Sequence, residues 1–304
     1  MTTSSTYHIP VMLKECMEYL NIHPDGIYVD ATYGGGGHSK AILERLSDKG
    51  KLFAFDQDKD AQQNLIQDKR FTFIPYNFSF ITQWLHYYNI YKVNGILADL
   101  GVSLHQFQKP ERGFSYRYNF ALDMRMNQDQ KLTAADVVNQ YSEQQLEQLF
   151  FNYSDLKNAK KLARLIVQYR FEHPIQTTFD LVNAVKPALP KVNDYAVLSK
   201  IFQAIRIEVN KEVEHLKKFL NQCYSLLDNG GRLVVLTYHS LEDRIVKHYM
   251  INGDTEKTLE PDVIYGKINY PYKILTKKPV EPSEEEIKQN PQARSAKLRA
   301  CEKI

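Results

Sequence analysis

Tyr28 to Ser39 read YVDATYGGGGHS, a short apolar run that ends in turn residues and continues into four adjacent glycines. We expect a strand over 27–31 and a helix over 39–46, with the glycines between them. Glycines in this position let the backbone approach a ligand closely, and the start of the helix presents free N–H groups and positive potential. The pattern predicts a ligand-binding loop at the end of the first strand.

A carboxylate further along the chain supports this interpretation. The next predicted strand, 51–56, ends in Asp56, about 20 residues beyond the glycines, where a carboxylate suits the two hydroxyls of a ribose. A nucleoside-bearing cofactor is therefore expected. Without this context, four adjacent glycines would be equally compatible with a flexible turn.

The loop departs from the dinucleotide fingerprint. Gly34 and Gly36 match its first two glycines, but Ser39 stands where the third is needed. Asp30, at the end of the first strand, would repel a pyrophosphate but could pair with the ammonium group of a methionine moiety. Both features favour S-adenosylmethionine over NAD.

The alternation of strands and helices predicts the fold class. Further strands are expected over 71–74, 95–99 and 232–238, and helices over 60–67 and 82–88. Strands separated by helices indicate right-handed crossovers and a mostly parallel, Rossmann-like α/β sheet with helices on both faces. Phe78 follows the third strand and is equally compatible with a ring that covers an adenine and with a core aromatic.

Only helical patterns occur between 101 and 198. One of them begins at Ser142, which forms a capping-box pattern with Gln145. A long helix is expected over 199–227, and Ser240 is expected to cap a helix after the fifth strand. The tail beyond 252 mixes Pro, Lys and Glu, and we expect a solvated loop over 281–286.

The candidate for the chemistry is Asp99, which ends the fourth strand. In open α/β sheets, ligands bind beyond the carboxyl ends of the strands at the switch in strand order. A carboxylate there could accept an N–H of a poorly nucleophilic exocyclic amine and later take its proton, with Ser103 as an orienting hydroxyl. The alternative is an aspartate that caps a helix or shapes a turn.

A substrate surface is predicted between Arg112 and Arg125, where Phe114 and Tyr116 stand among cationic side chains. Aromatic faces and cations are what a flipped or single-stranded base requires. Equally, these aromatics could dock the helical segment onto the sheet. His239, after the fifth strand, is a candidate contact for the substrate base or a structural histidine.

Composition places few limits on the partner. The chain has 304 residues, 43% of them hydrophobic, and 39 basic against 36 acidic residues give a net charge of +3. A nucleic-acid partner is permitted, and its basic footprint must be local. The absence of an apolar run of about 18 residues or of a secretory leader argues for a cytoplasmic protein without a membrane partner. The three separated cysteines indicate neither disulfides nor a metal site.

Several segments together resemble the RsmH/MraW family of small-subunit ribosomal RNA cytosine-N4 methyltransferases. The resemblance spans nearly the whole chain, in the segments 8–15, 26–42, 95–103, 112–116, 122–126, 202–210, 230–233, 239–247 and 290–299. Departures from the family pattern lie at 104–108, 127, 195–200 and 260–275.

The resemblance implies a class I S-adenosylmethionine-dependent methyltransferase domain, 1–103 and 199–304, interrupted by a helical substrate-recognition domain, 104–198. It implies methylation of a cytidine N4 in the decoding region of 16S ribosomal RNA, on a small subunit that is at least partly assembled. It also implies cofactor contacts from Gly36, Gly37, His38, Asp56, Phe78, Asp99 and Gln106.

Two other functions are compatible with a fold of this kind. An NAD-binding oxidoreductase is disfavoured by Asp30 and the missing third glycine. A non-catalytic RNA-binding or assembly factor is disfavoured because the glycine loop, Asp56 and Asp99 are all present. The sequence leaves open whether the protein is a homodimer.

Overall fold

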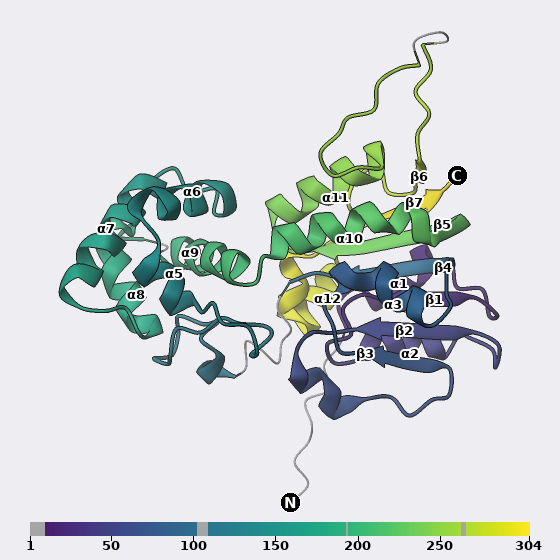
Figure 1. Cartoon of the computed structure of the whole chain (residues 1–304), viewed down its shortest axis with the longest axis horizontal. Coiled ribbons are helices and arrows are strands. Elements are labelled where there is room, and N and C mark those ends of the chain that lie inside the picture. The colour runs from purple at the N-terminus through teal and green to yellow at the C-terminus, as the bar shows by residue number, and fades with distance from the viewer. Residues whose placement is uncertain (1–9, 102–108, 193, 263–265) are drawn as a thin grey trace, which may run out of the picture. The chain divides into compact units, whose positions relative to one another are not determined.

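The computed structural model describes residues 10–101, 109–192, 194–262 and 266–304 (Figure 1). The chain divides into two compact units. Unit 1 comprises Met1–Gly101 and Glu214–Ile304, and unit 2 comprises Val102–Val213.

Unit 1 contains a seven-stranded sheet in the order β3-β2-β1-β4-β5-β7-β6. Its first five strands are parallel, and β7 is antiparallel to both of its neighbours. The strands are β1 (Ile27–Asp30), β2 (Lys51–Phe55), β3 (Phe71–Ile74), β4 (Val93–Asp99), β5 (Leu227–Thr237), β6 (Tyr272–Ile274) and β7 (Lys297–Lys303). The predicted mostly parallel α/β sheet is confirmed.

Strand order places the switch point of the sheet between β1 and β4. From β1 the chain builds outward to β2 and β3, and then crosses to the other side of β1 to form β4. Loops that leave two adjacent parallel strands in opposite directions open a crevice at the carboxyl ends. Asp30 and Asp99 end these two strands.

Both faces of the central strands are apolar and are covered by helices. Leu97, Val234 and Leu236 pack in a buried cluster with the helices α1 (Leu13–Leu20) and α2 (Gly37–Leu43). Because side chains alternate along a strand, Ile96 and Val235 face the opposite side. The remaining helices of this unit are α3 (Ile81–Tyr87), α10 (Glu212–Leu226), α11 (Ser240–Asn252) and α12 (Glu284–Gln289), with 3-10 turns at Lys59–Asn64, Phe78–Phe80 and Pro291–Ser295.

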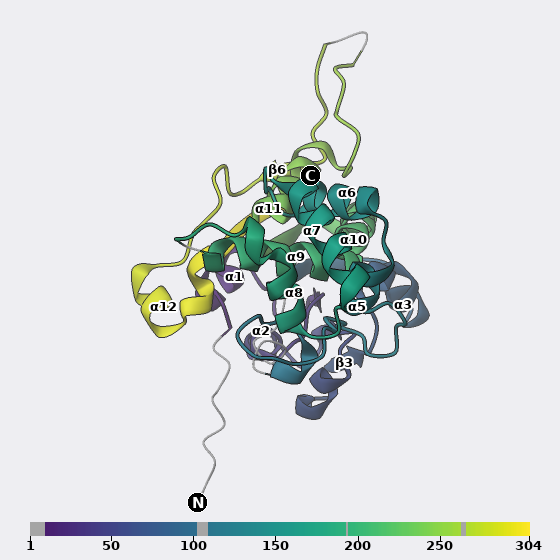
Figure 2. The same ribbon diagram turned by 90° about the vertical axis from the view of Figure 1, so that its left-hand side faces the viewer.

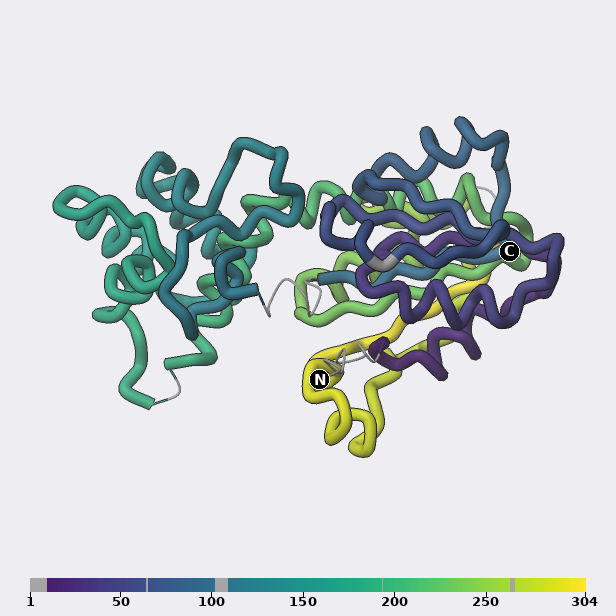
Figure 3. The backbone as a smooth tube through the Cα atoms, turned by 90° about the horizontal axis from the view of Figure 1, so that it is seen from below, coloured from purple at the N-terminus to yellow at the C-terminus, as the bar shows by residue number. Residues whose placement is uncertain are grey.

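The C-terminal segment departs from the prediction. The expected solvated loop over 281–286 is wrong at its end, because Ser283 accepts a hydrogen bond from the Glu286 N–H and begins α12. Strand β7 was not predicted, because its charged residues mask the apolar ones in KLRACEK. The final residues, yellow in Figure 3, run alongside β5, and the Arg299 guanidinium pairs with Asp243 at 2.6 and 3.0 Å.

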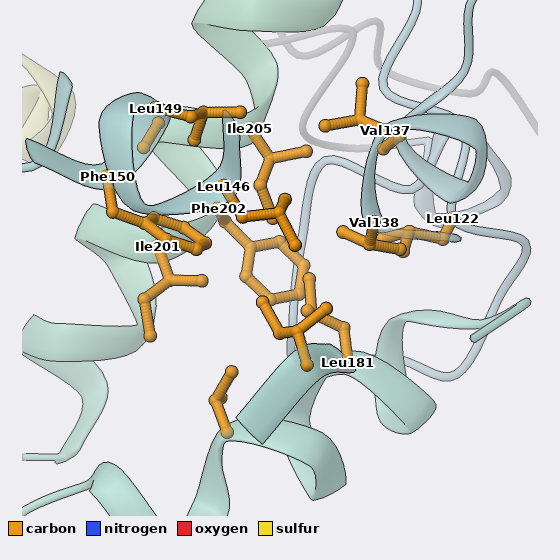
Figure 4. Close-up of a cluster of buried hydrophobic side chains, with 14 of the residues drawn as sticks. Leu122, Val137, Val138, Leu146, Leu149, Phe150, Leu181, Ile201, Phe202 and Ile205 are labelled. Atoms are coloured by element: carbon orange, nitrogen blue, oxygen red, sulfur yellow. The ribbon is translucent and has the colours of Figure 1, made fainter. Parts of the chain in front are cut away.

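Unit 2 is helical in its described residues. Its helices are α5 (Ala134–Gln140), α6 (Glu143–Tyr153), α7 (Ala159–Glu172), α8 (Thr178–Val185) and α9 (Asp194–Val209), with 3-10 turns at Pro110–Arg112 and Lys186–Ala188. The capping box of Ser142 and Gln145 is confirmed at the start of α6. Figure 4 shows Leu146, Phe150 and Phe202 in the buried core of this unit.

The single helix predicted over 199–227 is wrong. It is two helices, α9 and α10, which are separated at Asn210 and Lys211, and Lys211 has φ 49°. The Asn210 side chain accepts from the Met126 N–H at 2.7 Å and donates to the Met124 carbonyl at 2.8 Å. Because α9 contributes Phe202 to the helical core, the contacts place the return to unit 1 at Glu214, beyond the expected residue 199.

Candidate active site

The glycine loop, residues 31–36, connects β1 to α2 and is hydrogen-bonded to the strands on both sides of β1. On one side the Ala31 N–H donates to the Leu97 carbonyl of β4 at 2.8 Å. On the other, the Tyr33 N–H donates to the Phe55 carbonyl of β2 at 2.8 Å. The loop is therefore held at the switch point of the sheet, where a ligand is expected.

The backbone conformation of Gly36 and the nearby side chain of Tyr33 both favour glycine at this position. Its φ is +77°, and a Cβ there would lie 2.7 Å from the Tyr33 hydroxyl oxygen. Tyr33 cannot move aside easily, because its buried ring packs 5.5 Å from Phe71 and 5.4 Å from Phe73. At Gly37, which begins α2, a Cβ would lie 2.9 Å from the Pro10 ring.

Asp30, the last residue of β1, accepts hydrogen bonds from the glycine loop and from the first turn of α2. It is 1% exposed, accepts from the Ser39 hydroxyl at 2.7 Å, and accepts from the Thr32 N–H at 3.1 Å. Burial raises the pKa of this carboxyl, whereas His38, Ser39 and Thr32 oppose the rise. Ser39, which disrupts the dinucleotide fingerprint, is thus the hydroxyl that holds Asp30. Pairing of Asp30 with a ligand ammonium stays a prediction.

Asp56 follows the last residue of β2 and contacts the glycine loop directly. Its Oδ2 accepts from the Gly34 N–H and its Oδ1 from the Asp58 N–H, both at 2.8 Å. Burial raises the pKa of Asp56 to about 6; the two backbone N–H groups oppose the rise, and Asp58 and Asp30 add to it. A ligand that donates hydrogen bonds, as a ribose does, would stabilise the ionised form.

Asp99, at the end of β4, is fixed by three neighbours. Its N–H donates to the Thr32 hydroxyl at 2.6 Å, which joins it to the glycine loop. Its Oδ1 accepts from the Tyr238 hydroxyl at 2.6 Å, and its Oδ2 lies 3.9 Å from His38 Nδ1. The side chain keeps 20% exposure, so it is held in place and is still accessible.

Tyr238 is a residue of the candidate site that the sequence alone does not reveal. It follows β5, the neighbour of β4, so its hydroxyl reaches Asp99. The Tyr238 N–H donates to the buried Glu242 carboxylate at 3.0 Å. The available signal was its position directly after a central strand beside the switch point, but the sequence of one strand end does not show which residue of another strand faces it.

His38 is buried between the segment that precedes α1 and the end of β4. Its Nε2 lies 3.0 Å from the Val11 carbonyl oxygen and its Nδ1 faces Asp99. Phe78 is partly buried, and its ring contacts Phe219 edge-on at 5.1 Å. A role of either residue toward the cofactor stays a prediction.

His239, rather than Ser240, caps α11. His239 Nδ1 accepts from the Glu242 N–H at 3.4 Å, and Ser240 is the first helical residue. The expectation that Ser240 is the cap is therefore wrong by one residue. His239 Nε2 lies 3.0 Å from the Glu242 carboxylate, and the side chain is 10% exposed. These contacts favour the structural interpretation of His239 over contact with a base.

The residues of unit 2 that are predicted to bind substrate make hydrogen bonds, ion pairs and packing contacts within that unit. Arg112 is 4% exposed and donates to the carbonyls of Arg125 and Met126 at 2.9 and 3.1 Å, and Phe114 is 5% exposed in the helical core. Arg125 makes a two-pronged ion pair with Asp123 at 2.7 and 2.8 Å. Because their functional atoms are occupied or buried, we propose none of these residues as a base contact.

Tyr116 is likewise engaged inside unit 2. Its hydroxyl lies 3.1 Å from the Ser199 hydroxyl, and its ring stacks on Tyr195 with 6.1 Å between centroids. In the same segment, Tyr118 and Phe120 are 55% and 41% exposed. Binding of a base by this segment stays a prediction, and exposure makes these two side chains more accessible to a ligand than Phe114.

Two predicted site residues, Ser103 and Gln106, lie outside the described residues. Over the residues that are described, no group of three or more His, Cys, Asp or Glu side chains is arranged to hold a metal ion. Nor does any described helix combine the length and the apolar character that crossing a membrane requires.

Comparison with known proteins gives a full-length match. A family model described as the MraW methylase family matches residues 5–304. Two relatives named ribosomal RNA small subunit methyltransferase H are 54% identical to the chain: that of Christiangramia forsetii over 98% of both chains, and that of Flavobacterium johnsoniae over 100% of both. Among solved structures, an rRNA methylase from Streptococcus thermophilus aligns with 96% of this chain and 93% of its own, at 12% identity and a TM-score of 0.39.

Proposed function

Because the chain belongs to the MraW methylase family, we propose that it transfers a methyl group from S-adenosylmethionine to the exocyclic N4 of a cytidine in 16S ribosomal RNA. The proposed substrate is the RNA of the small ribosomal subunit, in its decoding region, and the proposed place of action is the cytoplasm. The chain is thus a methyltransferase with a class I, Rossmann-like fold.

One observation carries the proposal. The glycine loop is hydrogen-bonded to an aspartate at the end of each flanking strand: the Asp56 carboxylate accepts from the Gly34 N–H, and the Asp99 backbone N–H donates to the Thr32 hydroxyl. The proposed cofactor site would therefore have an acceptor for ribose hydroxyls on the β2 side and a second carboxylate on the β4 side. These residues fit S-adenosylmethionine, because a pocket with this many carboxylates favours a cationic sulfonium over a pyrophosphate.

Bound there, S-adenosylmethionine would supply a methyl group on a positively charged sulfur. The contribution of the protein is alignment and an acceptor for the amine protons. We assign the acceptor role to Asp99 Oδ2, since Oδ1 is occupied by the Tyr238 hydroxyl. Accepting an N–H from the cytosine amine would localise its lone pair on nitrogen, and the proton released on methylation would pass to the carboxylate or to solvent.

The test of this function is methyl transfer from labelled S-adenosylmethionine to small subunits that lack the modification, followed by nucleoside analysis of the RNA. We expect the label in N4-methylcytidine. Binding to the subunit without transfer would favour an assembly factor, and a bound nicotinamide dinucleotide in the purified protein would favour an oxidoreductase.

The pH dependence of cofactor binding tests the role of Asp56. If ribose hydroxyls donate to its carboxylate, the ionised form binds, so affinity should be constant well above pH 6 and fall as pH drops through about 6. Calorimetric titration from pH 8 to about pH 5 measures the change, with Asp56→Asn as the control that should be weak and insensitive to pH over the same range. Equal affinity of the native protein at both ends would exclude the assignment.

Tyr238→Phe tests the hydrogen bond that orients Asp99. Burial raises the pKa of Asp99, and the Tyr238 hydroxyl opposes that rise by stabilising the ionised carboxylate. Losing this donor should raise the pKa further, so the variant should lose turnover at a higher pH than the native enzyme as pH falls. The measurement is the pH profile of single-turnover methyl transfer. A profile scaled down without a shift would indicate that Tyr238 only fills space.

A further inference from the structure

Helix α3 and the segments on either side of it carry several large aromatic side chains, four of which form a chain of ring contacts. Tyr76 and Trp84 lie 4.5 Å apart between centroids with 31° between their planes. Trp84 contacts Tyr87 edge-on at 5.6 Å, and Tyr87 contacts Tyr88 at 5.2 Å. Tyr91, beyond the helix, contacts His86 at 4.9 Å. We call Tyr76, Trp84, Tyr87, Tyr88 and Tyr91 the α3 aromatic face.

Most of these rings lie outside the core of unit 1; Tyr88 is the one that contacts a buried ring, Phe53 of β2, at 5.5 Å. The helix buries Ile81 and Leu85 completely, and this is its contribution to packing. By contrast Tyr87 is 71% exposed, Tyr91 60% and Tyr76 46%. In Figure 2, α3 lies at the right-hand margin of the view. Large exposed apolar surfaces on a folded protein commonly mark a binding site.

Charge indicates what kind of partner fits this face. No Asp or Glu occurs from residue 69 to 98, although the chain has 36 of them. Two lysines lie near these residues. The Lys92 ammonium donates to the Ser225 carbonyl at 2.7 Å, and the Lys218 ammonium lies 4.3 Å from the centroid of the Phe80 ring at the start of α3. Exposed rings on a segment that has no carboxylates of its own, with lysines nearby, match the chemistry of single-stranded RNA, where bases stack on rings and phosphates meet cations.

The position of the face relates it to the site. Tyr76 follows the carboxyl end of β3, and Asp56 follows that of the adjacent strand β2. Because the strands are parallel, both residues lie at the carboxyl edge of the sheet. From Tyr76 the face extends along α3 toward the amino end of β4, which Tyr91 precedes by two residues.

We propose that the α3 aromatic face binds unpaired nucleotides of the RNA substrate by stacking. The proposal rests on the proposed function, since it assigns the same RNA a second contact outside the pocket. The face would hold nucleotides that flank the target, so it would contribute to RNA affinity and leave the chemical step unchanged.

The chain contains one tryptophan, Trp84, which makes the face directly observable. We expect single-stranded oligocytidylate to quench Trp84 fluorescence on titration, because a base that stacks on these rings changes the environment of the indole. Heparin, a polyanion without bases, should not quench it. Equal quenching by both would show attraction of charge alone and would overturn the proposal.

Variants separate stacking from folding and from catalysis. Tyr87→Ala with Tyr91→Ala should weaken oligocytidylate binding by about tenfold and raise the KM for small subunits with kcat retained. Tyr87→Phe with Tyr91→Phe keeps the rings and should behave as the native protein. The control is Tyr270→Ala, which removes a 53% exposed tyrosine close to β6. Strand β6 is the outermost strand on one side of the sheet, and β3, which precedes α3, is the outermost strand on the other.

The outcomes distinguish this proposal from the proposed function. Unchanged binding and KM in the alanine double variant would overturn the RNA surface while methyl transfer stands. A second possible occupant of the face is another copy of the chain. In that case the native protein would be an oligomer that dissociates in the alanine double variant, and Trp84 fluorescence would change with protein concentration but not with RNA. This result would also overturn the proposal. Base-dependent quenching without methyl transfer by the native protein would instead refute the proposed activity alone.

Discussion

Asp99→Ala is expected to lower the rate of methyl transfer by about 100-fold or more, the usual contribution of a group that aligns a nucleophile and accepts its proton. The expectation follows from geometry: the carboxylate is held by the Tyr238 hydroxyl and is still 20% exposed, and the backbone N–H of the same residue is bonded to Thr32 of the glycine loop. Single-turnover transfer at saturating cofactor is the measurement, since it isolates the chemical step from product release.

A matched control for this variant is Asp48→Ala. Asp48 is an exposed aspartate of the same unit, with 85% of its side chain accessible and a surface ion pair to Lys69. It should transfer methyl groups at the native rate. Turnover of Asp99→Ala within a few-fold of this control would remove Asp99 from the mechanism and leave it a residue that shapes the strand end.

Gly36→Ala is expected to weaken S-adenosylmethionine binding by about tenfold or more. A left-handed backbone conformation costs a non-glycine residue about 1–2 kcal/mol, and here the new Cβ would also lie 2.7 Å from the Tyr33 hydroxyl oxygen. The loop can relieve this contact only by changing the bend that carries its N–H groups. Gly36→Val adds branching at Cβ and should abolish detectable binding. Isothermal calorimetry measures both variants.

The control for the loop is Gly230→Ala. Gly230 has φ +75°, close to the +77° of Gly36, but a Cβ there has no neighbour within 4 Å. It carries the same backbone strain without the clash and lies in β5, so cofactor affinity should be unchanged. If Gly36→Ala also binds with native affinity, the bend is not part of the cofactor pocket.

The sequence predicts the parts of the site that are local. The strand–glycine–helix pattern at 27–46 places the loop, and the ends of β2 and β4 place Asp56 and Asp99, because a short apolar run that ends in a carboxylate is visible in one segment. In the sequence Ser39 is only an irregularity in the fingerprint, and its function as the hydroxyl that holds Asp30 appears in the structure.

What sequence reasoning missed depends on contacts between distant segments. Tyr238 lies 139 residues from the Asp99 it bonds. Strand β7 is stabilised by pairing with a strand on each side and by the ion pair of Arg299 with Asp243. Because these contacts come from other segments, the strand does not need a continuous apolar run that the sequence would reveal. Arg112 and Phe114 fit a base-binding pattern by residue type, but burial decides their role, and burial is a property of the folded unit.

The central claim is that one pocket, formed by the glycine loop with Asp56 and Asp99, holds the cofactor with its methyl group toward the acceptor carboxylate. A crystal structure of the protein with S-adenosylmethionine tests it most directly. We predict ribose hydroxyls within hydrogen-bond distance of Asp56 and the sulfonium methyl directed to the space beside Asp99 Oδ2. A cofactor bound elsewhere, or with its methyl group turned away from Asp99, would contradict the account.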